Sequence, residues 1–98
     1  MIISNEPGFY KEGCYGIRIE NLVLVEPATV PEGGDRLMLS FETLSYAPID
    51  RRLIDVALLS SAEIAWLNAY HGKVFDLLRD ALDRTERRWL RDATQPLL

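Results

Sequence analysis

Two glutamates near the start of the sequence, Glu6 and Glu20, are the residues best suited to chemistry. Glu6 lies between a short apolar run and Pro-Gly, and Glu20 interrupts an apolar strand pattern, GIRIENLVLV. A charge in such a setting is expected to have a partner or a metal ion. The acids stand fourteen positions apart around a glycine-containing turn, so adjacent strands could bring both carboxylates to one point. Carboxylates suit Mn²⁺, Mg²⁺ or Zn²⁺, or a pair of such ions.

The residues around these acids suggest supporting roles, each with a simpler alternative. The two-residue period of a strand places Arg18 on the same face as Glu20, where it could orient that carboxylate. An ordinary ion pair between Arg18 and Glu20, with Glu6 at the surface, is the alternative that spacing alone favours. Tyr10 and Tyr15, in the predicted turn, could line a substrate pocket or merely cover a hairpin end.

The remaining reactive side chains point to structural roles. His71, the only histidine, falls in the apolar stripe of a predicted helix, so a packed core residue is expected rather than a ligand. Cys14, the only cysteine, cannot form a disulfide within the chain, which fits a reducing compartment. The sequence contains no Ser/His/Asp set, no phosphate-binding glycine loop and no Cys/His zinc pattern.

Composition restricts the partners and the compartment. The chain has 98 residues and a net charge of −4, with no basic stripe that would indicate binding to nucleic acid. No secretion signal and no run of about 18 apolar residues is present, so we expect a cytoplasmic protein that does not associate with membranes.

The elements that must position the two glutamates are antiparallel strands joined by turns. A first strand from Ile2 should end at Asn5-Glu6-Pro7-Gly8, because proline removes a backbone donor and glycine permits positive φ. Alternation and β-branched residues predict the later strands. The expected order is a turn over 9–15, a strand over 17–25, a loop from Pro27 to Asp35 and a strand over 37–46, antiparallel to the one before it.

A helical region follows the strands and an extended connector over 48–59. The connector carries four charged residues, which we expect to pair at the solvated surface: Asp50, Arg51, Arg52 and Asp55. Ser60 with Glu63 forms a capping box that predicts a helix start. That helix should run to about Leu82 with one stripe facing the sheet, made of Ile64, Leu67, His71, Val74, Leu78 and Leu82.

A second capping pattern, Asp83 with Glu86, predicts a shorter helix that ends at Pro96. Its buried side should consist of Trp89, Leu90 and Ala93. The predicted fold class is therefore α+β, with antiparallel strands followed by a long helix and a short C-terminal helix.

The stretch SNEPGFYKEGCYGIRIENLVLV resembles a segment of the pita-bread metallopeptidases, in the Xaa-Pro aminopeptidase (aminopeptidase P) branch. The family includes prolidase, creatinase and methionine aminopeptidase. In it, the glutamates of the motifs around Glu-Pro-Gly and Gly-Ile-Arg-Ile-Glu are the last two metal ligands. The likeness continues through LSFETLSYAPIDRRLID and SSAEIAWLNAYHGKV, which resemble the C-terminal extension of the longer cytosolic forms. It implies that residues 1–47 are the C-terminal strands of the catalytic domain and that 48–98 are a connector and helical extension.

This resemblance implies a dinuclear site of which the chain holds only a part. Family members bind two divalent ions, usually Mn²⁺, through two aspartates, one histidine and two glutamates, and hydrolyse the bond between an N-terminal residue and proline. Glu6 and Glu20 would be the glutamates, with Glu20 bridging and Arg18 orienting a ligand. The chain's other candidates lie downstream of both and do not replace the missing ligands: Asp35, Asp50, Asp55 and His71.

We therefore expect the chain to be the C-terminal portion of such a peptidase, inactive by itself and unable to hold the ions tightly. The substrate of the complete enzyme would be a peptide with proline in second position. The alternative is a non-catalytic interaction module with Glu6 and Glu20 as vestiges and the helical tail as its working surface. A sheet that begins abruptly at Ile2 exposes an edge and an apolar face, so self-association is expected.

Overall fold

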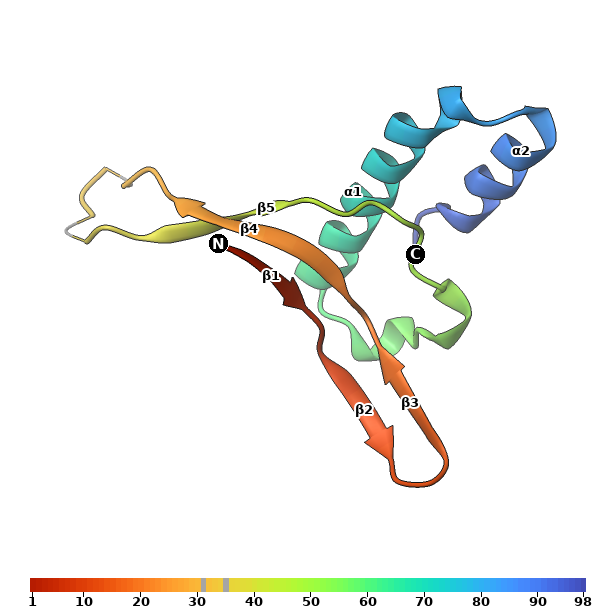
Figure 1. The fold of residues 1–98 in the computed structure, drawn as a ribbon, viewed down its shortest axis with the longest axis horizontal. Coiled ribbons are helices and arrows are strands. Elements are labelled where there is room, and N and C mark those ends of the chain that lie inside the picture. Colours follow the sequence, from red (N-terminus) through yellow and green to blue (C-terminus); the bar gives the residue numbers. More distant parts are fainter. Residues whose placement is uncertain (31, 35) are drawn as a thin grey trace. The chain divides into compact units, whose positions relative to one another are not determined.

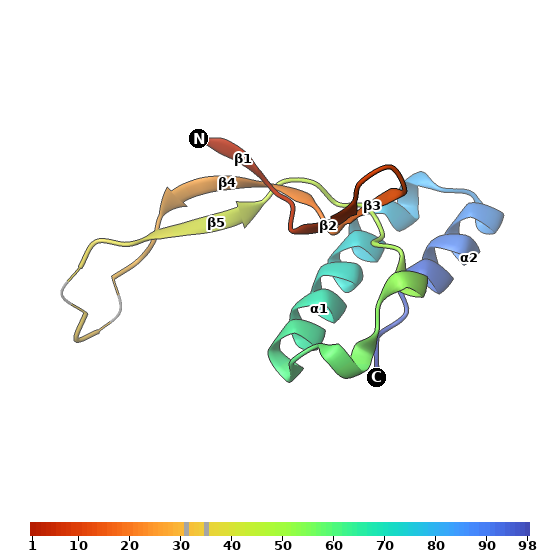
Figure 2. The same cartoon turned by 90° about the horizontal axis from the view of Figure 1, so that it is seen from below.

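The computed structural model describes residues 1–30, 32–34 and 36–98, and it divides into two compact units (Figures 1 and 2). We call Met1–Ser45 the strand unit and Tyr46–Leu98 the helical unit. The predicted loop from Pro27 to Asp35 contains Pro31 and Asp35, which lie outside the described residues. The expectation that 1–47 are catalytic-domain strands and 48–98 an extension stays a prediction.

The strand unit contains a three-stranded antiparallel sheet and a two-stranded ladder. The sheet has the order β1 (Ile2–Asn5), β4 (Asn21–Pro27) and β5 (Leu39–Thr43), with β4 in the middle. The ladder pairs β2 (Gly8–Lys11) with β3 (Tyr15–Arg18). The predicted antiparallel pairing of β4 and β5 is confirmed, and the last strand is shorter than the predicted 37–46.

Two predictions for the residues between Gly8 and Pro27 were wrong. The single strand over 17–25 is broken at Ile19 and Glu20, between β3 and β4. The turn over 9–15 is instead most of β2, a tight reversal and the start of β3. The reversal is closed by a hydrogen bond from Cys14 N–H to the Lys11 carbonyl (3.0 Å), with Gly13 at φ +73°. Glycine suits this positive φ because it has no Cβ.

The connector is less extended than predicted. It contains two 3₁₀ turns, η1 (Arg51–Leu53) and η2 (Val56–Leu58), each capped by the aspartate before it. Asp50 forms the predicted ion pair with Arg52 at 2.8 Å, and the hydrogen bonds from the Arg52 side chain and backbone lower the pKa of Asp50 to about 2. The first backbone amides of a helical turn have no acceptor within the turn, and the two aspartate side chains supply one.

Both predicted capping boxes are confirmed. Ser60 precedes α1 (Ser61–Leu78), and Asp83 precedes α2 (Arg84–Ala93); each exchanges hydrogen bonds with the glutamate three positions later. α1 ends four residues before the predicted Leu82, because the chain tightens into the 3₁₀ turn η3 (Arg79–Ala81). α2 folds back beside α1 (Figures 1 and 2). Neither helix, over the residues described, is long and apolar enough to cross a bilayer.

The core that the structure describes lies in the helical unit. Its buried apolar residues come from both helices and the C-terminal segment: Leu67, Tyr70, Val74, Leu90 and Leu97. Connector residues such as Ile49 and Ile54 pack against them. Within the helical unit, the buried residues of the α1 stripe pack with this connector and the C-terminal segment. That the stripe faces the sheet stays a prediction. Trp89 was predicted to be buried and is 63% exposed.

Polar residues of α1 bind the segments that cover it. His71 is fully buried, and its Nε2 accepts a hydrogen bond from Ile49 N–H (3.0 Å). The prediction of a packed, hydrogen-bonded core histidine is therefore confirmed. Asn68 binds Leu97 twice, donating from Nδ2 to its carbonyl (3.0 Å) and accepting its N–H at Oδ1 (2.6 Å). Side chains thus satisfy backbone groups of the segments that pack on the helix.

Candidate metal site

The two ladders of the strand unit belong to one long hairpin. β1 pairs with β4 in the register that sets Asn5 opposite Asn21, and β2 pairs with β3 in the register that sets Gly8 opposite Arg18. Both pairings fit a single antiparallel register that runs from the open end of the hairpin to its tip. The ladder is therefore interrupted without a shift of register, at the position of Pro7.

This continuous register places Glu6 directly opposite Glu20. The neighbouring pair is Pro7 and Ile19, in which Ile19 N–H donates to the Pro7 carbonyl (3.1 Å) and proline has no N–H to return. Hydrogen-bonded and non-bonded pairs alternate along an antiparallel ladder, so Glu6 and Glu20 form a non-bonded pair. In such pairs the side chains approach most closely, with Cα atoms about 4.5 Å apart.

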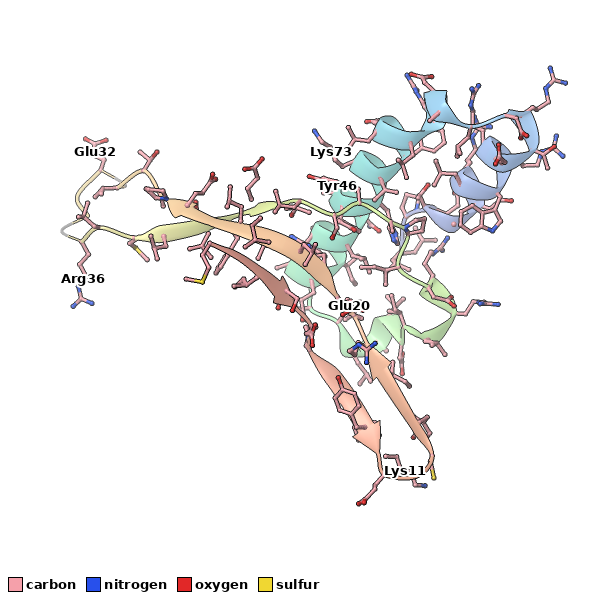
Figure 3. All side chains as sticks on the ribbon, in the orientation of Figure 1. Lys11, Glu20, Glu32, Arg36, Tyr46 and Lys73 are labelled. Carbon is pink, nitrogen blue, oxygen red and sulfur yellow. The ribbon has the colours of Figure 1, made fainter. Side chains whose placement is uncertain are left out.

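Both glutamates are exposed in this chain, and the exposure of Glu6 is the one that the ion-pair alternative expected. Glu20 lies at the junction of β3 and β4 (Figure 3), with about half of its side chain accessible. Its partner is Arg18, whose Nε lies 3.6 Å from Glu20 Oε2. The predicted same-face contact is present, and it is the contact that an ordinary ion pair would also give.

Tyr10 ties this ion pair to the rest of the hairpin. The Tyr10 hydroxyl, by hydrogen bonding, and then the Glu20 carboxylate raise the pKa of Arg18, with a smaller contribution from Glu6. Glycines make room for the ring: a Cβ on Gly16 would stand 2.8 Å from Tyr10 Cδ1, and a Cβ on Gly8 would stand 2.8 Å from its hydroxyl. Tyr10, Arg18 and Glu20 therefore form one chain of polar contacts.

The contacts of Tyr10 were missed from the sequence. The signal was present in two glycines of the paired strands. Gly8 stands opposite Arg18 and Gly16 stands opposite Tyr10, and because neither has a side chain, they leave a space that the Tyr10 ring fills. Tyr15 lies against Phe9, with ring centroids 6.1 Å apart. The substrate-pocket role of Tyr10 and Tyr15 stays a prediction.

The arrangement fits a hard divalent cation but supplies few ligands. Like charges directly opposite each other destabilise a sheet, and a cation between them removes that cost. Among the described residues, no three His, Cys, Asp or Glu side chains gather as a metal site. Asp50 and Asp55 cap turns of the connector, and Asp35 lies outside the described residues. Among the described residues, the hairpin therefore offers two carboxylates, fewer than a divalent ion needs to fill its coordination shell.

Comparison with known proteins gives consistent matches along the chain. Residues 37–97 match the family model for the C-terminal region of peptidase M24. "Aminopeptidase P1" of Lotus japonicus is 43% identical over 99 residues, which is 99% of this chain and 15% of that protein. A "Probable Xaa-Pro aminopeptidase P" of Tuber melanosporum is 42% identical over 100 residues, again 99% of this chain and 16% of that protein. The chain thus spans about 15% of the length of these relatives.

A solved structure matches the fold of nearly the whole chain. It is described as an X-prolyl aminopeptidase from Caenorhabditis elegans, a cytosolic enzyme with a di-nuclear active site. The two share 36% sequence identity with a TM-score of 0.81, over 98% of this chain and 16% of the C. elegans chain. The predicted α+β arrangement, antiparallel strands followed by a long and a short helix, is that of the C-terminal part of the pita-bread fold.

Proposed function

The chain belongs to the peptidase M24 family, as the C-terminal region of an Xaa-Pro aminopeptidase, and we propose that it supplies two carboxylate ligands to a dinuclear metal site. The complete enzyme would hydrolyse the bond between an N-terminal residue and a proline in second position. The observation that carries the proposal is that Glu6 and Glu20 stand directly opposite each other in the hairpin, as a pair without backbone hydrogen bonds between them. Two negative charges directly opposite each other destabilise the hairpin, and the same two charges attract a cation.

Each polar residue of the hairpin has a defined part in this proposal. Glu6 and Glu20 would hold the ions through their carboxylate oxygens. Arg18, whose Nε lies 3.6 Å from Glu20 Oε2, orients that carboxylate, and the Tyr10 hydroxyl holds Arg18 in turn. A pair of divalent ions, when bound, supplies the Lewis acidity that activates water and polarises the scissile carbonyl. Mn²⁺ is the metal we propose, since carboxylate oxygens suit it.

By itself the chain should be inactive. Two carboxylates leave most of the coordination shell to water, so metal binding should be weak. The relatives' additional length, which this chain does not span, would supply the remaining ligands and the proton-transfer groups. We further propose a cytoplasmic protein, in line with the cytosolic C. elegans enzyme, and self-association through the exposed apolar residues of the strand unit, such as Phe9 and Phe41.

Manganese titration followed by NMR tests the site. Paramagnetic Mn²⁺ broadens nearby backbone amide signals, so residues flanking Glu6 and Glu20 should broaden first. Glu6→Gln and Glu20→Gln should each weaken the effect by about tenfold or more, because a lost charged ligand is worth at least 1.4 kcal/mol. Glu12→Gln, in the turn between β2 and β3, is the matched control and should leave the broadening unchanged.

Broadening that is insensitive to both substitutions would remove the metal-site proposal and leave the interaction-module alternative. An activity assay adds a second check. The purified chain should release no N-terminal residue from an Xaa-Pro peptide in the presence of Mn²⁺, and clear turnover would contradict the partial-site proposal.

A further inference from the structure

Four arginines gather on one face of α2, in the helical unit. Their positions recur at the three- and four-residue spacing that brings side chains together on a helix: Arg84, Arg87, Arg88 and Arg91. Together with Leu82 and Asp83 they line a hollow of about 430 Å³. Four guanidinium groups and one carboxylate give this hollow a strong positive charge, in a chain whose net charge is −4.

Two of these arginines are held in place by the fold. Arg87 donates from Nε to the Arg79 carbonyl (3.0 Å) and from Nη2 to the Leu82 carbonyl (3.3 Å), which satisfies backbone acceptors of the turn between the helices. The Arg91 guanidinium lies 5.7 Å from the centroid of the Phe75 ring, within the range of a cation–π contact. A guanidinium has five donors, so these contacts leave donors of Arg87 and Arg91 available to a ligand.

The other two, Arg84 and Arg88, have no hydrogen bond, ion pair or ring contact with any residue that the structure describes. The nearest acids in sequence are engaged elsewhere. Asp83 accepts from Glu86 N–H (2.8 Å), and Glu86 accepts from Asp83 N–H (3.0 Å), so both carboxylates serve the helix cap. Arg84 and Arg88 thus add two cations without described partners to the two that the fold holds in place.

Helix stability does not explain this arrangement. Arginines three and four positions apart repel one another, and Arg84 stands at the first helical position, where the helix dipole disfavours a positive charge. Arg91 in the last turn suits the helix dipole, but stability would favour an acid at position 84 in the first turn. The row of like charges is therefore better explained by an anion that neutralises it.

We propose that the hollow binds a small anion carrying several phosphate groups. Guanidinium groups match phosphate oxygens in charge and in fork geometry, and the volume is that of a small-molecule site. α2 has ten residues and is about 15 Å long, and the remainder of the chain is acidic, which disfavours a nucleic acid duplex at this surface. The site is independent of Glu6 and Glu20.

Calorimetric titration of the chain with inorganic tripolyphosphate, in a buffer that contains a metal chelator, tests the proposal. We expect one site whose affinity falls with added salt. The double variant Arg84→Gln/Arg88→Gln should weaken binding by about tenfold or more, because it removes two charge-assisted contacts. The control Arg36→Gln/Lys73→Gln removes the same number of charges outside the hollow, from the strand unit and from α1, and should bind as the unaltered chain does (Figure 3).

Circular dichroism should give the same helix content for both double variants, since none of the four side chains makes a contact that the fold needs. Three outcomes would overturn the proposal. They are no binding of tripolyphosphate, equal weakening in both double variants, and tighter binding of polyglutamate, duplex DNA or anionic lipid vesicles than of tripolyphosphate. The last outcome would identify the arginines as a macromolecular docking surface.

Discussion

The strand unit and the helical unit differ in how much they bury. Among the described residues, the buried side chains of the strand unit are Asn21 and Val23, whereas the helical unit buries seven residues around α1 and α2. In the strand unit, by contrast, aromatic and aliphatic side chains such as Phe9 and Phe41 are more than 60% exposed. The helical unit thus has a core of its own, whereas the strand unit leaves many of its large apolar side chains exposed.

The two units also differ in charge. The strand unit has seven acidic and three basic residues, and the helical unit has eight of each, with half of its basic residues in α2. The opposed glutamates thus belong to the unit with an excess of acids, and the arginine cluster of α2 belongs to the unit in which the charges balance. The helical unit therefore holds most of the buried core that the structure describes, and the strand unit holds the opposed glutamates, whose like charges disfavour its own fold.

The largest effect is expected from truncating the helical core. Leu90 is 1% exposed and Leu22 of β4 is 45% exposed, so the same substitution can be compared in the two units. Leu90→Ala should destabilise the helical unit by about 2–5 kcal/mol, because it leaves a cavity. Leu22→Ala should cost less than about 1.5 kcal/mol, because it removes little buried surface. Urea unfolding followed by tryptophan fluorescence measures the helical unit, since both tryptophans, Trp66 and Trp89, lie in it.

Equal losses from Leu90→Ala and Leu22→Ala would break the comparison, because they would mean that the strand unit contributes as much core as the helical unit. A loss in the strand unit is followed through amide hydrogen exchange of β4, which tryptophan fluorescence does not report. Circular dichroism before unfolding confirms that both variants start from a folded state.

A smaller effect is expected from acid, and only in the helical unit. Burial, and then the nearby charge of Arg51, lower the pKa of His71 below its ordinary value of 6.5. The unfolded chain therefore takes up a proton first as the pH falls through 6.5. The stability that neutral His71 provides is complete above that pH and is lost below it. The urea midpoint of the tryptophan signal should fall between pH 7 and pH 5.

The variant His71→Gln separates this titration from other effects of acid. It removes the only histidine, so the midpoint should become nearly independent of pH over the same interval, even though its value at pH 7 is lower. A midpoint that still falls by the same amount would assign the acid sensitivity to other groups.

The smallest effect is expected from the opposed glutamates of the strand unit. Glu6→Gln removes a like charge facing Glu20, so without metal it should raise the melting midpoint slightly, by about 1–3 °C. Adding Mn²⁺ should reverse the order, because the unaltered chain gains a bound ion that the variant has lost. Differential scanning calorimetry at low salt measures both. Glu12→Gln should change neither midpoint, and a Glu6→Gln variant that is less stable without metal would show that the carboxylate serves the fold.

Much of the helical unit could be predicted from the sequence because its signals are local. The capping boxes at Ser60 and Asp83 each join residues three positions apart, so they form without contacts from distant parts of the chain. The buried role of His71 followed from the spacing of the apolar stripe. Trp89 was misplaced because a helix of ten residues has apolar side chains on more than one face, and the packing partner decides which face is covered.

The sequence alone therefore determined the kinds of elements, their caps and the two glutamates that a hairpin could bring together. Only the tertiary structure decided that Glu6 stands directly opposite Glu20, that Tyr10 reaches Arg18 across two glycines, and that the arginines of α2 line one hollow. Register and packing depend on contacts between residues far apart in the chain, and no local propensity encodes the choice among them. The opposition of Glu6 and Glu20 and the contact of Tyr10 with Arg18 depend on that choice.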